Sequence, residues 1–319
     1  MTRYQVWVMP AAFVVAVLAS VLVSGLNPYD LFLVGQVSIL IAVSAALVVL
    51  MGGAGLLSLS SAAFLAVGAY AAVILVEDAG VSYLLAVPIG GLIGGAAGFV
   101  LGLVSLRLSG FHLAIVTLGF VQVLLIVLRQ GGELTGGGYG RLTPPAEAPG
   151  IGDLFPSDYP IMAVFFAVLV VAGAASLMRS RVGRAWLALR DNEPAARMQG
   201  INVNAMKLRA FTLSSLIISF MGGIYAFVLG SASPNSFTVD VSIFHIALVV
   251  VGGLTGRVSG AVLAPLLLFM VPEYLNAAGQ YRDLLYAGLL LLTLVLLPDG
   301  LSGVLRSLGR LTTRRRQHA

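Results

Sequence analysis

The chain has 319 residues, of which 59% are hydrophobic and only 10% are charged, whereas a soluble domain has about 25% charged residues. It contains no cysteine, which excludes disulfides and thiolate metal sites. The net charge of +5 does not indicate nucleic-acid binding, because the basic residues are distributed by membrane sidedness. We therefore expect no nucleic-acid partner.

Apolar segments recur along the whole chain, each near the length of a transmembrane helix. They predict an all-α polytopic membrane protein with about ten transmembrane helices. A signal peptide is the rival interpretation of the first segment, but its apolar run exceeds the usual core of about 7–15 residues and lacks a clear cleavage site. The expected spans are 6–26, 31–52, 56–76, 81–106, 111–128, 159–178, 210–230, 242–256, 258–276 and 284–298.

The charges support an orientation with both termini in the cytoplasm. In that topology 15 of the 18 basic residues lie on the cytoplasmic side, and ten of the 13 acidic residues lie outside. Basic loops are retained in the cytoplasm during insertion, so this bias fits the assignment. The chain then forms a single transmembrane domain, 1–319, with an external loop at 129–158, a cytoplasmic loop at 179–209 and a basic cytoplasmic tail at 306–319.

Two glycine-rich segments, "MGGAGLLSLSS" (51–61) and "VGGLTG" (251–256), interrupt or end apolar spans. Free backbone groups at membrane depth are tolerated only beside protein or a water-filled path. These segments therefore either line a translocation route or are ordinary cytoplasmic turns, and both interpretations stay open. The residues that would line such a route are Gly52, Gly53, Ser58, Ser60, Ser61, Gly252 and Gly253.

A third glycine-rich stretch, "PIGGLIGGAAGFVLG" (88–102), lies inside the fourth span and has glycine at every fourth position. Glycines at this spacing allow the backbones of neighbouring helices to approach closely in lipid. The stretch therefore predicts helix packing, either within the chain or against a second subunit.

Motifs of catalysis are missing from the sequence. There is no G-x-x-x-x-G-K-[ST] loop for ATP, and the single lysine, Lys207, lies outside any such context. Histidines at 112, 245 and 318 lack metal-ligand spacing, and structural roles fit His112 and His245 better than catalytic ones. We therefore expect no enzyme, no metal and no cofactor.

Charged side chains are also missing from the centres of the spans. An ionisable residue there costs about 2.5–3.5 kcal/mol and is kept by proton-coupled transporters for function. Every acid, arginine and lysine of this chain falls in a loop or near a span end. A partner protein is therefore the expected source of energy, although sodium coupling through backbone carbonyls would leave no such trace.

The most polar interval of the chain is residues 181–208. Asp191 and Asn192 suit the start of a helix, with Glu193 and Pro194 in its first turn, and Gly200 suits the position just after its end. This predicts a helix of about two turns over 193–199, which is too short to be stable alone. Either it inserts into a cleft of a partner, or the interval is a basic loop held by anionic lipid.

The segment "GRAWLALRDNEPAARMQGI" resembles the cytoplasmic loop of LivM-type permeases, the membrane subunits of branched-chain amino acid ABC importers. It is related to the E-A-A-x-x-x-G coupling motif, with Ala196 and Gly200 at the required spacing. Further segments match this family in the same order along the chain: "LMGGAGLLSLSSAAFLAVGAYAA", "LAIVTLGF", "LTGGGYG", "SPNSFTVDVSI", "VVVGGLTGRVSGAVLAP" and "LPDGLSGVL".

The resemblance implies a set of partners in a bacterial inner (plasma) membrane. They are cytoplasmic ATPase subunits, a second permease subunit that is LivH-type or a copy of this chain, membrane lipid, and an external substrate-binding protein that touches the 129–158 loop. ATP hydrolysis would belong to the ATPase subunits. The residues expected to couple to them are Arg184, Arg190, Asn192, Glu193, Ala196 and Gly200.

One departure from the family concerns the ligand. Where the family usually shows Gly-His after Ser-Leu, this chain has Ser60 and Ser61. Relatives that move urea and short amides are therefore an alternative to branched-chain amino acids. A secondary transporter or facilitative channel is the alternative class, whereas the glycine-broken spans disfavour a scaffold without transport.

Overall fold

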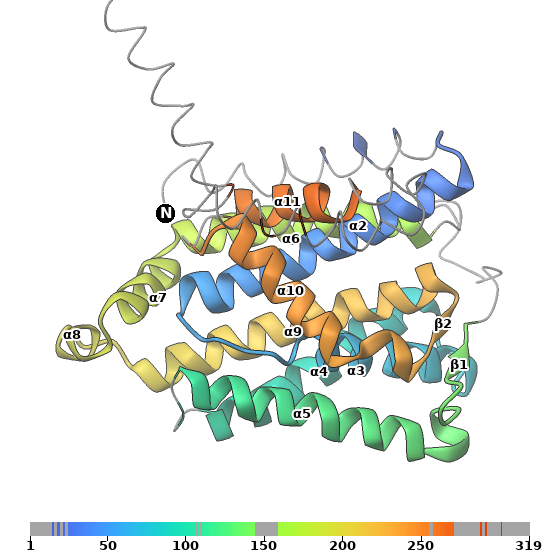
Figure 1. Cartoon of the computed structure of the whole chain (residues 1–319), viewed down its shortest axis with the longest axis horizontal. Coiled ribbons are helices and arrows are strands. Elements are labelled where there is room, and N and C mark those ends of the chain that lie inside the picture. The colour runs from blue at the N-terminus through green and yellow to red at the C-terminus, as the bar shows by residue number, and fades with distance from the viewer. Residues whose placement is uncertain are drawn as a thin grey trace, which may run out of the picture.

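The structure is a computed structural model that describes residues 25–105, 108, 110–143, 159–254 and 258–270, together with isolated positions nearer both termini. Most of the expected first span, 6–26, the expected last span, 284–298, and the tail at 306–319 lie outside the continuously described residues. The described residues form a bundle of helices that run along one long axis (Figure 1).

Most of the bundle consists of helices at the positions that hydropathy predicts. Six of them are long and apolar enough to cross a membrane. This supports an all-α membrane protein, and the described strands are limited to one short pair. The elements are α2 (Pro28–Leu47), η1 (Val48–Gly53), α3 (Ser61–Glu77), α4 (Tyr83–Ser105), α5 (Phe111–Gln130), η2 (Gly132–Leu134), β1 (Arg141–Leu142), α6 (Tyr159–Arg179), α7 (Arg181–Asp191), α8 (Glu193–Met198), α9 (Val203–Leu229), β2 (Ser231–Ala232), η3 (Pro234–Phe237), α10 (Val239–Gly252), α11 (Ser259–Pro265) and η4 (Leu266–Met270).

Two helices, α3 and α9, begin about five or more residues away from the expected positions. The expected third span starts at residue 56, but α3 begins at Ser61, because the chain leaves the helix at Gly55, whose φ is +71°. The expected seventh span starts at residue 210, but α9 begins at Val203. The side chain of Asn202 starts it earlier by accepting a hydrogen bond from the Ala205 amide at 3.1 Å.

The glycines of α4 serve packing within this chain. A Cβ atom added at Gly94 would lie 1.7 Å from Ser219 Oγ, and one at Gly98 would lie 1.7 Å from Ser215 Oγ, both on α9. Helix α9 also approaches α3, since a Cβ at Gly222 would lie 2.1 Å from the Leu65 carbonyl oxygen. Helices α3, α4 and α9 therefore form one closely packed unit, as the glycine spacing predicts.

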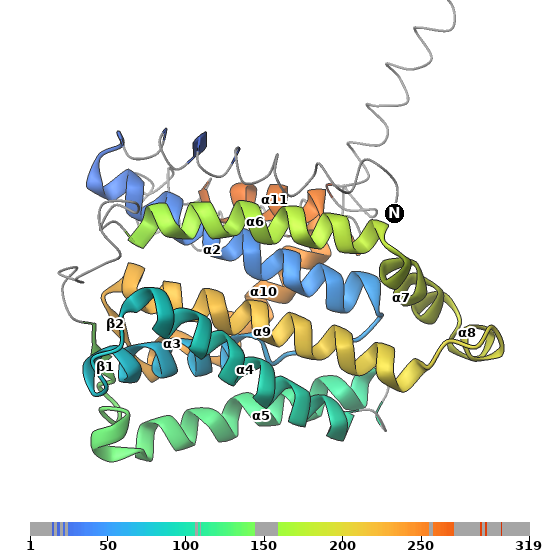
Figure 2. The same cartoon turned by 180° about the vertical axis from the view of Figure 1, so that it is seen from behind.

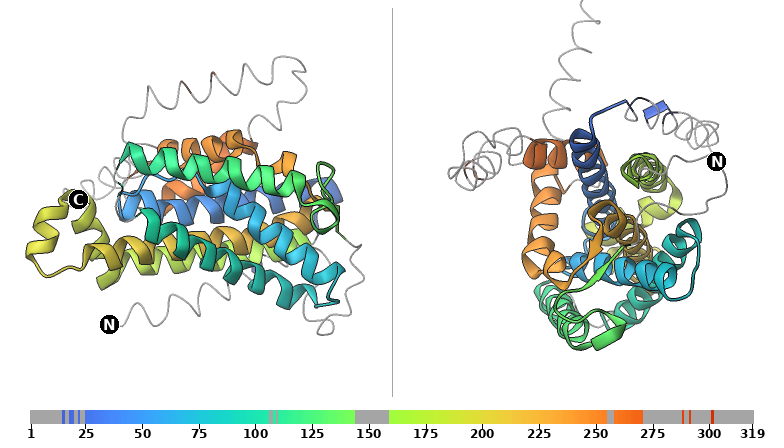
Figure 3. Two further views of the ribbon diagram at one scale, coloured as in Figure 1. Left: turned by 90° about the horizontal axis from the view of Figure 1, so that it is seen from below. Right: turned by 90° about the vertical axis from the view of Figure 1, so that its right-hand side faces the viewer.

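The two ends of the bundle carry different structures. Helices α7 and α8 project from one end, while β1 and β2 lie at the other (Figures 1 and 2). In the left view of Figure 3 the α7–α8 segment, in yellow-green, again extends beyond the bundle. Strand β1 pairs antiparallel with β2, so the turn after α5 is held to the end of α9.

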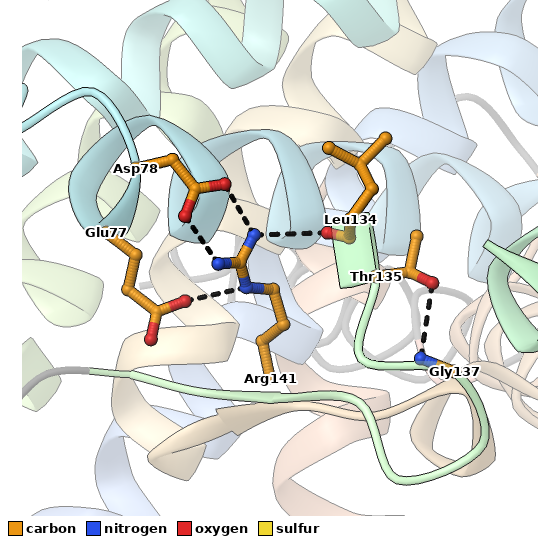
Figure 4. A network of polar contacts seen from close by, with 6 residues as sticks. All are labelled: Glu77, Asp78, Leu134, Thr135, Gly137 and Arg141. Carbon is orange, nitrogen blue, oxygen red and sulfur yellow. Dashed lines mark hydrogen bonds and ion pairs between the residues drawn. The ribbon is translucent and has the colours of Figure 1, made fainter. Parts of the chain in front are cut away.

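An arginine fixes the turn at the β1 end. Arg141 Nε lies 2.7 Å from Glu77 Oε2, and its two terminal nitrogens lie 2.7 and 2.5 Å from the oxygens of Asp78 (Figure 4). The hydrogen bonds from Arg141 hold the pKa of Asp78 below its usual range. Arg141 also donates to the Leu134 carbonyl at 3.1 Å, so the segment 131–143 that follows α5 is attached to the end of α3.

The tight contact between α3 and α9 predicts the effect of a single methyl group. Gly222→Ala should lower the unfolding temperature of the detergent-solubilised protein, because overpacking a close backbone contact costs about 1–3 kcal/mol. Gly119→Ala on α5 is the matched control, since a Cβ there meets no described atom within 4 Å. Equal unfolding temperatures for the two variants would contradict the close packing of α3 against α9.

Candidate coupling site

Helix α7 is firmly attached to the bundle. Its N-cap, Ser180, accepts hydrogen bonds at Oγ from the amides of Val182 and Gly183, at 3.2 and 3.3 Å. The helix is amphipathic and buries Trp186, whose indole nitrogen donates to the Met206 carbonyl on α9 at 3.0 Å. A capped helix with one buried face is a rigid support for α8, the next helix in the chain.

Helix α8 has the caps that the sequence predicts at both ends. Asn192 Oδ1 accepts a hydrogen bond from the Ala195 amide at 3.0 Å. Gly200 has φ +79°, its amide donates to the Arg197 carbonyl at 3.0 Å, and the Ile201 amide donates to the Ala196 carbonyl at 3.1 Å. This pair of bonds is a Schellman motif, which requires the left-handed backbone that glycine adopts easily.

The only lysine of the chain anchors α8 to α9. Lys207 Nζ lies 2.8 Å from Glu193 Oε2, and Arg197 lies 2.8 Å from the other carboxylate oxygen. The hydrogen bond from Lys207 is the main reason why the pKa of Glu193 lies below its ordinary value. The Lys207 side chain is only 11% exposed, so this lysine is a structural partner of α8 rather than a free surface cation.

Of the residues expected to contact the ATPase, some are buried or bonded within the chain and others are exposed. Ala196 is buried, and Glu193 is bonded to the chain's own cations. Arg184 is exposed and donates to the Arg179 carbonyl at 3.2 Å. The outermost surface of α8 is instead formed by exposed residues around Met198, which is 90% exposed. Glu193 and Asn192 thus shape the helix, while its tip is left open to solvent.

Arg190, the remaining member of that expected set, is directed toward the bundle. Its Nη1 atom donates to the Gly52 carbonyl at 2.7 Å and to the Leu254 carbonyl. These two carbonyls lie at the ends of η1 and α10, in the two glycine-rich segments predicted to be breaks. Arg190, which was expected at the ATPase contact, therefore bonds both of the segments that were expected to line a translocation route.

The first glycine-rich segment is a true interruption between two helices. Between Gly53 and Ser61 the chain is not helical, and its polar side chains are buried. Ser58 Oγ and Ser60 Oγ lie 2.7 Å apart, and Ser61 Oγ lies 3.1 Å from His245 Nδ1 on α10. An imidazole therefore lies beside the Ser60–Ser61 pair.

Two further side chains, which were not singled out from the sequence, bond backbone amides within this interruption and in the first turn of α3. Thr117 Oγ1 on α5 accepts from the Leu59 amide at 2.9 Å, and Ser242 Oγ on α10 accepts from the Ala62 amide at 3.0 Å. Both are fully buried. In the sequence, each of these residues is only a small hydroxyl residue within an otherwise apolar helix, and this pattern is too common to identify a functional side chain.

The second glycine-rich segment ends α10. Gly253 has φ +102°, a conformation that favours glycine. A Cβ at Gly252 would lie 2.6 Å from the Gly260 carbonyl oxygen, so α10 and α11 meet backbone to backbone. Gly252 therefore allows close packing of α10 against α11, and Gly253 allows the turn that ends α10. Among the described residues no group of three His, Asp or Glu side chains is placed to hold a metal ion.

The fold and these contacts define a polytopic membrane protein that presents a short capped helix at one end of its bundle. The family model "Branched-chain amino acid transport system / permease component" matches residues 29–294. The chain belongs to this family.

Three relatives illustrate the range of similarity. The permease protein LivM of the Escherichia coli K12 high-affinity branched-chain amino acid transport system is 37% identical over 277 residues, which cover 79% of this chain and 65% of that protein. The ribose import permease protein RbsC of the same organism is 29% identical over 92% of this chain and 95% of its own length. A probable branched-chain amino acid permease LivM of Methanocaldococcus jannaschii is 26% identical over 60% of this chain and 56% of its own length.

The chain spans only 65% of the length of the LivM proteins of Escherichia coli and Salmonella typhimurium that it matches. No solved structure matches it.

The Glu193–Lys207 pair predicts how firmly α8 is held. Lys207→Met should speed amide hydrogen exchange in α8 about fivefold, because a partly buried charged hydrogen bond contributes about 1 kcal/mol here. Arg197→Met is the matched control and should give a twofold change at most, since it removes only an exposed pair within the helix. Equal exchange rates in the two variants would show that Lys207 does not anchor α8.

The same pair predicts a pH dependence. Because the pKa of Glu193 is lowered in the folded protein, its contribution is fully present above the ordinary glutamate value of 4.5 and is lost as the pH falls through the lowered pKa. The ratio of exchange rates between Lys207→Met and the unmodified protein should therefore stay constant from neutral pH down to about 4.5 and approach one below that value. A ratio that already declines above pH 6 would contradict this assignment.

Proposed function

We propose that this chain is the permease subunit of an ATP-driven importer that passes branched-chain amino acids from an external binding protein to the cytoplasm. Family membership supports the class, and the 37% identity to a LivM protein, against 29% to a ribose permease, supports the substrate. The observation that carries the proposal is α8, a short helix capped at both ends and held out from the bundle.

The proposed topology has about ten spans, with both termini in the cytoplasm of a bacterial inner membrane. The charges at the two ends of the bundle support it. Helices α7 and α8 carry Arg181, Arg184 and Arg197, whereas Glu77 and Asp78 lie beside Arg141 of β1 at the other end. Basic residues stay on the cytoplasmic side during insertion, so the α7–α8 end is the cytoplasmic one.

The proposed partners are two cytoplasmic ATPase subunits, a second permease subunit, which is LivH-type or a copy of this chain, and an external binding protein. The helix α8 would occupy a cleft of one ATPase subunit. Its tip around Met198 is exposed, and its base is attached to α9 through Lys207. A movement of the ATPase would therefore be transmitted to a helix that spans the membrane.

The first experiment is purification of tagged protein from its native membrane, with identification of the proteins that accompany it. We expect ATPase subunits and a permease partner, and we expect the ATPase subunits to be lost when Glu193 and Gly200 are both replaced. Recovery of this chain alone, with uptake that is insensitive to ATP depletion, would overturn the proposal and favour a secondary transporter.

Replacement of Gly200 tests α8 with little change in bulk. A Cβ there meets no described atom within 4 Å, so a substitution acts through the backbone conformation at φ +79°. Gly200→Val should reduce uptake at least fivefold at an unchanged amount of inserted protein, because a β-branched residue is strained there by about 1–2 kcal/mol. Gly200→Asn is the control and should retain uptake within twofold, since asparagine tolerates this conformation. Normal uptake with valine would count against the role of α8.

A further inference from the structure

We propose that Arg190 is a positioning residue that makes the two glycine-rich ends of η1 and α10 move together with α7 and α8. This inference rests on the proposed function, and it assigns Arg190 to the inside of the permease rather than to the ATPase contact. Three features of the molecule support it: the carbonyls that the guanidinium binds, the connection of its helix to α8, and the kind of bond that it makes.

The guanidinium of Arg190 joins parts of the chain that are far apart in sequence. The residue lies in the last turn of α7, and its Nη1 atom donates both to Gly52, in the last turn of η1, and to Leu254, two residues after α10. The stem of the side chain is close as well, since a Cβ at Gly55 would lie 3.0 Å from Arg190 Cγ. One side chain therefore contacts both of the segments at which membrane helices end in glycine.

A short, hydrogen-bonded stretch of backbone connects Arg190 to α8. Asn192, the N-cap of α8, also closes α7, because its amide donates to the Ala188 carbonyl at 3.1 Å. Arg190 thus lies two residues before the cap on which α8 is built. A displacement of α8 by a partner would therefore act on the last turn of α7, which carries the guanidinium, as well as on α9 through Lys207.

The bonds of Arg190 act directly on the backbone of the two segments. None of the ion pairs found within the described residues involves Arg190. Its acceptors are neutral carbonyls at helix C-termini, where the aligned peptide dipoles give partial negative charge. A hydrogen bond from a charged guanidinium to a carbonyl is stronger than one between neutral groups, so these bonds can hold the two segments to α7.

The inference predicts a defect in coupling rather than in assembly. Arg190→Met keeps much of the length of the side chain and its packing against Gly55 but removes the donors. In the complex with its ATPase subunits, reconstituted into vesicles, we expect normal assembly, ATP hydrolysis within twofold of normal, and at least a tenfold loss of substrate transported per ATP hydrolysed. Arg190→Lys keeps a charge and several donors, and it should recover a large part of the loss.

Arg181→Met is the matched control. Arg181 begins the same helix, is also exposed and loses the same charge, but no hydrogen bond connects it to either glycine-rich segment within the described residues. We expect this variant to transport normally.

The absence of native cysteine makes a second measurement possible. One spin label is placed at Arg181→Cys on α7 and one at Leu57→Cys in the segment after η1. With Arg190 present, the distance between the two labels should be the same with and without ATP. In the Arg190→Met background that distance should change when ATP binds, because α7 would then move independently of the segment after η1. A distance that changes with ATP in the presence of Arg190 would overturn the inference.

The possible failures are distinguishable. Absence of ATP-driven uptake in the unmodified complex would overturn the proposed function and this inference with it. Loss of the ATPase subunits from Arg190→Met alone would make Arg190 a docking residue, which overturns this inference and leaves the proposed function intact. Unchanged transport per ATP in Arg190→Met, or an equal defect in Arg181→Met, would overturn the inference as well.

Discussion

An interrupted helix inside a membrane protein must find new partners for its backbone polar groups, because hydrocarbon offers none. The chain meets this requirement between η1 and α3 with side chains from α5 and α10, and the hydroxyls of Thr117 and Ser242 take two of the amides. The interruption therefore fixes the positions of four segments relative to one another. Without the interruption, these two hydrogen bonds would not form and would not hold α5 and α10 at this place.

At the α7–α8 end of the bundle, charged side chains rather than hydroxyl groups bond the polar groups of the chain. Helix α8 is too short to fold on its own, and it is held by its caps and by the buried end of Lys207. Arg190 occupies carbonyls that end two other helices. Both cations are thus used to satisfy acceptors of the same chain, and the tip of α8 around Met198 stays exposed.

The sequence was informative wherever the controlling interactions are local. Hydropathy located the long helices, and the capping residues Asn192 and Gly200 predicted the two ends of α8 within a residue. It could not predict contacts between distant segments. Thr117 bonds a backbone amide 58 residues away, and Arg190 reaches a carbonyl 138 residues away. Nothing in a hydrophobic pattern distinguishes these side chains from polar residues that face lipid headgroups or water, so the polar connections of the candidate site became visible only in three dimensions.

The glycine contacts among α3, α4 and α9 also have a consequence for heredity. Every amino-acid substitution that a single nucleotide change makes in a glycine codon adds a Cβ atom. At Gly68, Gly94 and Gly222 that atom would lie about 2 Å or less from an atom of another helix, closer than van der Waals contact permits. At these positions even alanine, the smallest replacement, would produce a steric clash. This part of the bundle therefore tolerates few point mutations, whereas a glycine with open space before it, such as Gly119, accepts the same changes at little cost.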